Sequence, residues 1–126
     1  MAVARASAVT TGRVYDPPDP DGATVVLVDR LWPRGLATAT APFDRWLKDV
    51  APSTALRTFY GHRPERFAEF AHRYRRELRE DSTGAVGELV AIARSGPVVL
   101  LTATRDLEHS SAHVLATHLR RRLVRR

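Results

Sequence analysis

The chain of 126 residues is 44% hydrophobic and 27% charged, which suits one domain and excludes collagen-like, low-complexity and wholly disordered proteins. It has no Cys, which excludes disulfides, Fe–S clusters, thiolate zinc sites and a cysteine nucleophile. The net charge of +6 suggests an anionic partner, but five arginines lie in the last seven residues and leave only +1 for the rest.

The first residues carry little structural signal. Residues 1–11 lack clear periodicity, and we interpret them as a flexible lead-in. Neither they nor any other stretch approaches the ~20 apolar residues of a membrane span, so we expect no membrane contact and a cytoplasmic location. Residues 12–15 predict a short strand, which a Pro-, Asp- and Gly-rich loop at 16–22 ends.

Two continuous apolar runs predict strands that are covered on both faces. They are residues 23–28 and 98–103, and both are rich in β-branched or aliphatic side chains. The link between the first strand, at 12–15, and the strand at 23–28 is short and rich in Pro. It suits a hairpin better than a helical crossover, so the sequence leaves open whether these two strands are parallel.

Helices are predicted between and after these strands. Ser53 is a typical N-cap and Gly61 a typical helix end, while Pro42 is suited to a first helical turn. Pro64 opens a longer helix with apolar residues at helical spacing. The predicted helices are 42–50, 53–61, 85–94, about 110–123, and the one from Pro64 with the core face Phe67, Phe70, Ala71, Tyr74 and Leu78.

These elements predict the fold class and the domain organisation. Helices that alternate with apolar strands indicate a single compact three-layer α/β domain with a small, mainly parallel sheet flanked by helices. We assign the domain to residues 12–119 and treat residues 120–126 as an Arg-rich tail.

Ligands of open α/β sheets usually bind beyond the carboxyl ends of the strands, and this rule predicts a site here. Asp29 and Arg30 follow a buried strand, where Asp29 could act as an acid or base or orient a ligand, and Arg30 could clamp an anion. The alternative is that Asp29 caps backbone amides and Arg30 braces a loop. The other predicted ligand contacts are Arg13, Tyr15, Trp32, Arg34 and Arg57, of which Trp32 could stack on a ring or fill the core.

Further candidates lie near the predicted start of the last helix, whose N-terminal end favours anions. Asp106 could exchange protons or only cap the helix, and His109 could shuttle protons or only bond the loop. His62, on a loop, is another possible base. His109 and His113 have metal-ligand spacing, but no matching Glu follows, so we predict neither a metal nor a cofactor. The nucleotide-fold, P-loop, hydrolase and zincin motifs GxGxxG, GxxxxGK[ST], GxSxG and HExxH are absent from the sequence.

Several motifs resemble a known family. The segments RVYD at 13–16 and VDRLWPRG at 28–35 are followed by WLKD at 46–49 and by APS-x-x-LR at 51–57. They resemble the domain of unknown function 488 family, small bacterial proteins often called YeaO-like, over about residues 12–119. The resemblance implies a compact α/β domain and no particular reaction or substrate. The chain departs from the pattern at Ser110, where many relatives have Asn, and at Thr104-Arg105, where many have Ala-Lys.

Two functions of different classes follow. The first is a ligand-binding domain or enzyme for an anionic small molecule, phosphorylated or nucleotide-like, in an Arg, Asp and His pocket at the strand ends. The second is a nucleic-acid-binding or regulatory module that uses the Arg-rich C-terminal helix. The sequence determines neither whether the protein is an enzyme nor its oligomeric state. The tail arginines of the second hypothesis are Arg120, Arg121, Arg122, Arg125 and Arg126.

Overall fold

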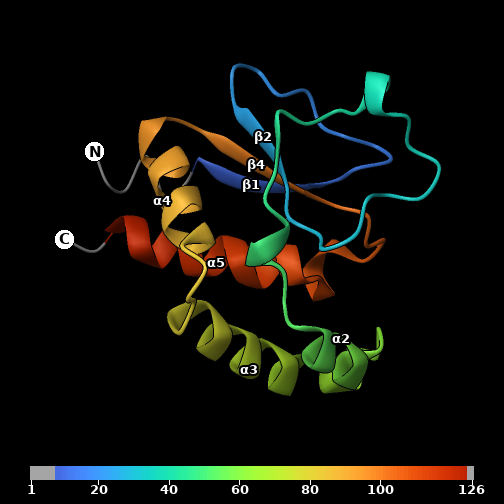
Figure 1. The fold of residues 1–126 in the computed structure, drawn as a ribbon, viewed down its shortest axis with the longest axis vertical. Coiled ribbons are helices and arrows are strands. Elements are labelled where there is room, and N and C mark those ends of the chain that lie inside the picture. The colour runs from blue at the N-terminus through green and yellow to red at the C-terminus, as the bar shows by residue number, and fades with distance from the viewer. Residues whose placement is uncertain (1–7, 125–126) are drawn as a thin grey trace.

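In the computed structural model, which describes residues 8–124, four parallel strands form one sheet in the order β1-β4-β2-β3 (Figure 1). The strands are β1 (Val9–Arg13), β2 (Thr24–Leu27), β3 (Arg45–Trp46) and β4 (Val98–Thr102). β4 lies between β1 and β2, and all five of its residues are buried. The α/β fold class with a parallel sheet is therefore confirmed, and the two continuous apolar strands, β2 and β4, are the interior strands of the sheet.

The first two strands are parallel and do not form a hairpin. They pair with opposite sides of β4, so the loop at 14–23 must pass across β4. Pro18 of this loop packs on Gly12, where a Cβ would lie 2.6 Å from the Pro18 Cδ. β1 also begins at Val9, earlier than predicted, because residues 9–13 pair one for one with β4. The predicted lead-in is thus partly strand, and residues 1–7 lie outside the described part.

The predicted helix at 42–50 is wrong. The segment forms the edge strand β3 and then a 3-10 turn, Lys48–Val50. Asp44 binds Val25 twice, because its N–H donates to the Val25 carbonyl and its carboxylate accepts from the Val25 N–H, both at 2.8 Å. Beyond the paired residues 45–46, the N–H of Leu47 donates to the carbonyl of Leu27 in β2. These long-range bonds outweigh the local signal for a helix.

The other predicted helices are confirmed as α2 (Thr54–Tyr60), α3 (Phe67–Arg79), α4 (Ala85–Ser95) and α5 (Ser111–Val124). Ser53 caps α2 by accepting from the Leu56 N–H, and Gly61 ends it at a φ of +53°. A 3-10 turn, Pro64–Arg66, precedes α3. Within residues 8–124, no helix is both long and apolar enough to cross a membrane.

The two faces of the sheet are covered differently. The helices pack on one face, where α5 lies against β1 and β4 and α3 packs on α5 (Figure 1). On the other face, Leu27 and Leu101 pack under loop residues such as Leu36 and Phe43. The third layer is therefore made of the loops at 14–23 and 28–44 and not of helices. Both loops start at carboxyl ends of strands, which places them at the predicted site.

We expect Gly12→Ala to destabilise the fold, because the added methyl group would meet Pro18 at 2.6 Å and the Leu101 Cδ2 at 3.2 Å. Overpacking of this kind costs about 1–3 kcal/mol of unfolding free energy. Gly87→Ala in α4 is the matched control, since a Cβ there meets nothing within 4 Å and Ala favours a helix by up to ~1 kcal/mol. Urea unfolding of both variants measures the difference, and an unchanged midpoint for Gly12→Ala would contradict this packing.

Candidate functional site

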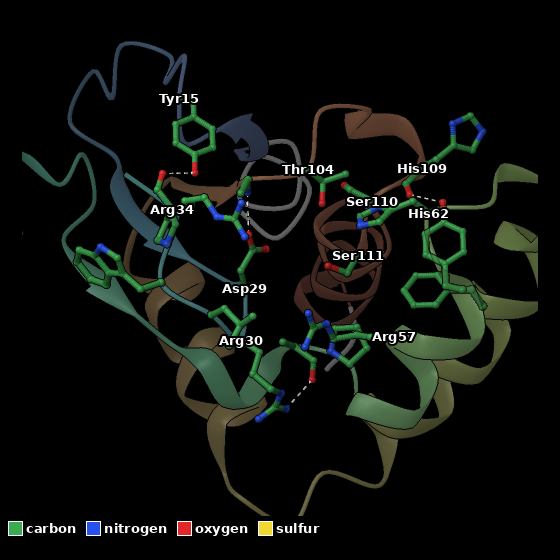
Figure 2. Close-up of a pocket in the computed structure, with 18 residues that line it drawn as sticks. Tyr15, Asp29, Arg30, Arg34, Arg57, His62, Thr104, His109, Ser110 and Ser111 are labelled. Carbon is green, nitrogen blue, oxygen red and sulfur yellow. Dashed lines mark hydrogen bonds between the residues drawn. The ribbon is translucent and has the colours of Figure 1, made fainter. Parts of the chain in front are cut away.

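A cavity of about 490 Å³ opens at the carboxyl edge of the sheet (Figure 2). Small-molecule sites have volumes of about 300–1,000 Å³, so one ligand fits. Segments that follow β1, β2 and β4 form one side, and residues of α2, α3 and the start of α5 form the other. Eight of the ten predicted site residues line it: Tyr15, Asp29, Arg30, Trp32, Arg34, Arg57, His62 and His109.

Asp29 is fixed at the sheet side of the cavity. Its Oδ1 accepts from the Thr102 hydroxyl and its Oδ2 from the Ala103 N–H, both at 2.7 Å. The Trp46 indole N–H donates to its backbone carbonyl at 2.7 Å. Burial raises the pKa of Asp29, while the bonds from Ala103 and Thr102 and the charge of Arg57 act against this rise. The carboxylate is therefore held in place, and it faces a cation across the cavity.

Arg30 extends away from Asp29 (Figure 2). Its Nη2 donates to the Ala51 carbonyl at 3.3 Å, and its Nη1 lies 3.8 Å from the Asp49 carboxylate. Its Nε is buried without a hydrogen-bond partner. This agrees with the alternative that Arg30 braces a loop, yet the contacts are long and leave donors unused. Arg30 and Ala51 also line a second, smaller cavity of about 320 Å³.

Two further arginines line the cavity from opposite sides. Arg34 lies in the loop after β2, and its backbone carbonyl accepts from the Tyr15 hydroxyl at 2.8 Å, which joins that loop to the end of β1. Arg57 projects from α2 on the helical side (Figure 2). Both guanidinium-bearing residues are exposed. With Arg30 they give the cavity three arginines against one carboxylate, Asp29, among its described lining residues.

Trp32 is packed in the loop layer and also lines the cavity. Its indole N–H donates to the Leu36 carbonyl at 2.8 Å, and its ring makes edge contacts with Phe43 and Trp46 at centroid distances of 5.3 and 5.5 Å. These contacts fix it in the loop layer. It also forms part of the cavity wall, where an apolar group of a ligand could pack.

Asp106 and His109 bind each other. The Asp106 carboxylate lies 2.7 Å from the His109 Nδ1, and the imidazole packs edge-on against Phe67 at 5.1 Å. Neither Asp106 nor Phe67 lines the cavity. The His109 carbonyl accepts from the Tyr60 hydroxyl at 2.6 Å, which ties this turn to α2. Asp106 also lies before the 3-10 turn Leu107–His109 and does not cap α5.

Ser110 and Ser111 are the main lining residues that sequence reasoning missed. The Ser110 hydroxyl accepts from the His113 N–H at 3.1 Å and so caps α5, and Ser111 begins that helix. N–H groups in a first helical turn have no partner within the helix and favour anions. A Ser pair directly before an apolar helix is a cap signal, and it could have identified them. His62, at a φ of +56°, lines the same side from the loop after α2.

Arg13 and the C-terminal arginines lie elsewhere. Arg13, at the end of β1, does not line the cavity, and its Nε is buried without a hydrogen-bond partner. Arg120 belongs to α5 and donates to the Val9 carbonyl at 2.6 and 3.2 Å, so it is part of the packed fold. Arg121 and Arg122 are in the last turn of α5, and Arg125 and Arg126 lie outside the described residues. Among residues 8–124, no group of three His, Asp or Glu could hold a metal ion.

Comparison with known proteins places the chain among small bacterial relatives. The family model described as "Inactive DUF488-N3 subclade" matches residues 8–126. The uncharacterised protein Rv3073c of Mycobacterium tuberculosis is 46% identical over 112 residues, which cover 89% of this chain and 93% of that protein. The uncharacterised protein YeaO of Escherichia coli is 36% identical over 108 residues, 86% of this chain and 93% of that protein. No solved structure gives a significant match.

We expect Asp29→Asn to change how stability depends on pH. Because the pKa of Asp29 is raised in the fold, the folded state binds this proton more tightly than the unfolded state does. Asp29 therefore supports stability below the ordinary Asp pKa of about 3.9, and this support is lost as the pH rises through the folded pKa. From pH 3 to pH 7, the wild type should lose unfolding free energy relative to Asp29→Asn.

Thermal unfolding across this pH range measures the effect, and the exposed residue Glu65 provides the control Glu65→Gln, which removes one carboxylate outside the cavity. A wild type that gains stability relative to Asp29→Asn over the same range would contradict the environment described for Asp29.

Proposed function

The chain belongs to the DUF488 family, a family of unknown function, and we propose that its cavity binds an anionic small molecule, phosphorylated or nucleotide-like, without converting it. One observation carries this proposal. Three arginines line a cavity that holds a single carboxylate, and that carboxylate already accepts two hydrogen bonds. The cavity lining therefore carries more positive than negative charge, and of the three arginines only Arg30 lies near a carboxylate of the described residues outside the cavity, that of Asp49.

The donors around the cavity suit an oxyanion. Guanidinium groups bind carboxylate and phosphate through paired hydrogen bonds, and Arg34 and Arg57 are both exposed. The first turn of α5, at Ser111, adds backbone N–H groups and the positive end of the helix dipole. Arg30 can add a third guanidinium, because its present contacts at 3.3 and 3.8 Å are long. A ligand at the centre of the cavity would meet cations from both sides.

Two observations favour binding over catalysis. The matching subclade is described as inactive. The Asp106–His109 pair has the composition of an acid/base couple, but only His109 lines the cavity, and the imidazole contacts Asp106 and Phe67, neither of which lines it. Ser110, which stands where many relatives have Asn, lines the cavity, so this lining lacks an amide side chain that many relatives carry.

The alternative is nucleic-acid binding through the Arg-rich end of α5, and the fold changes how it must be tested. Deleting residues 120–126 would remove the buried Leu123 and the Arg120 bond to β1, so a loss of binding would only report unfolding. The double substitution Arg121→Gln and Arg122→Gln leaves both in place. If this variant loses binding to DNA at physiological salt while the cavity binds no anion, the alternative replaces the present proposal.

The proposal is tested by thermal-shift and calorimetric titration with inorganic phosphate, sugar phosphates and nucleotides. A ligand at ~100 times its Kd should add about 2.7 kcal/mol of stability. A charge-assisted hydrogen bond contributes about 1.5–3 kcal/mol, so Arg57→Gln should weaken binding about 10- to 100-fold. Arg94→Gln, on exposed α4 surface outside the cavity, is the control and should leave the Kd unchanged. Equal losses in both variants, or no binding by the wild type, would contradict the proposal.

A further inference from the structure

Asp29 is an unexpected group in a cavity that recognises anions. It is the one carboxylate among the described lining residues, and it shares the cavity with Arg34 and Arg57. Yet Asp29 forms no ion pair with an arginine among the described residues, because its oxygens bind Thr102 and Ala103. The fold thus presents a negative acceptor and positive donors to the same ligand.

The carboxylate has acceptor positions left over. Two carboxylate oxygens offer about four lone-pair positions, and the bonds from Thr102 and Ala103 use two of them. The Trp46 indole, on β3, donates a hydrogen bond to the backbone carbonyl of Asp29. The backbone that carries the Asp29 side chain is therefore held in place. Because Asp29 lines the cavity, the remaining positions are within reach of a ligand there. A fixed acceptor of this kind selects ligands that carry hydrogen-bond donors.

The same charge determines where an anionic group can lie. A phosphate beside Asp29 would be repelled, whereas Arg57 and the first turn of α5 attract it. In Figure 2, Arg57, Ser110 and Ser111 face the Asp29 side from the helices. The ligand should therefore be a bipolar molecule, with its anionic group toward the helices and its donors toward the sheet.

Apolar side chains line the cavity between Asp29 and the cationic helical side. Trp32 and Pro33 lie on the loop side of the cavity, and Tyr60 and Phe70 lie on the helical side. They can hold the carbon skeleton that separates an anionic group from a hydroxyl. Inorganic phosphate would satisfy the arginines alone and would leave both Asp29 and these walls without contacts.

We propose that the ligand is a phosphate ester of a polyhydroxylated carbon skeleton, a sugar phosphate either free or within a nucleotide, whose hydroxyl groups donate to Asp29 while its phosphate binds Arg57 and the first turn of α5. This inference rests on the proposed anion-binding function and names the ligand class of the same cavity. Asp29 then provides selectivity between phosphate compounds, and the arginines provide affinity.

Calorimetric titration of the full-length protein with three probes tests the inference. Methyl phosphate has the ester but no hydroxyl group, ribose 5-phosphate has both, and AMP places the same sugar in a nucleotide. For the wild type, the Kd of ribose 5-phosphate or AMP should be at least tenfold lower than that of methyl phosphate. Tighter binding of ribose 5-phosphate identifies a free sugar phosphate as the source, and tighter binding of AMP identifies a nucleotide.

The variant Asp29→Asn separates recognition from a structural role. It should weaken binding of the hydroxylated probes about tenfold or more and leave methyl phosphate binding unchanged or tighter, since a repulsive charge is removed. Glu65→Gln makes the same change of charge outside the cavity and should alter none of the three Kd values. If Asp29→Asn does not fold, the Kd values of the wild type for the three probes still test whether the cavity prefers hydroxylated phosphate esters.

Each other outcome has a distinct meaning. Equal wild-type affinity for methyl phosphate and the hydroxylated probes overturns this inference and leaves the anion-binding proposal intact. Equal weakening of all three probes by Asp29→Asn also overturns it, because Asp29 would then act only through the shape of the site. If no probe binds the wild type, the anion-binding proposal fails, and this inference fails with it.

Discussion

The hydrogen bonds of Asp29 to the end of β4 are the contact on which the site depends. β4 is an interior strand whose residues are all buried, and Thr102 is its last residue, so the buried core of the sheet holds this carboxylate. The bonds also join the chain after β2 to the chain after β4, although 73 residues separate Asp29 from Thr102. The loop that carries Arg34 starts just beyond this joint. The position of the loop is therefore set by the sheet.

Separate partners explain why Asp29 and Arg30 do not neutralise each other. Asp29 and Arg30 lie two and three residues beyond the end of β2, and their side chains bind partners on different segments. Asp29 turns toward β4, and Arg30 turns toward the Ala51 carbonyl and Asp49. Two adjacent opposite charges thus stay apart at the edge of one cavity. Each remains able to bind a ligand group of the opposite polarity.

The sequence predicted the elements that local chemistry determines and missed those that depend on distant partners. The cap at Ser53, the ending at Gly61 and the apolar strand β4 are visible in short windows of sequence. The strand β3 is not, because only its pairing with β2 makes residues 45–46 extended. Eight of the ten predicted site residues line one cavity, since the strand-end rule needs only strand positions to bring them together. Asp106 was misplaced because a 3-10 turn separates it from α5.

Asp29 is fixed by hydrogen bonds whereas two of the arginines are exposed, and this difference suggests how the cavity would discriminate between anionic ligands. Asp29 is held by two side-chain hydrogen bonds and by the Trp46 bond to its backbone, so binding would cost it little conformational entropy. Arg34 and Arg57 are exposed, and ordering their long side chains on a ligand carries an entropic cost. The charge of the arginines can attract many anions at similar strength. The fixed acceptor cannot adapt to a ligand that lacks donors, so in the proposed site selectivity among those anions would come from Asp29.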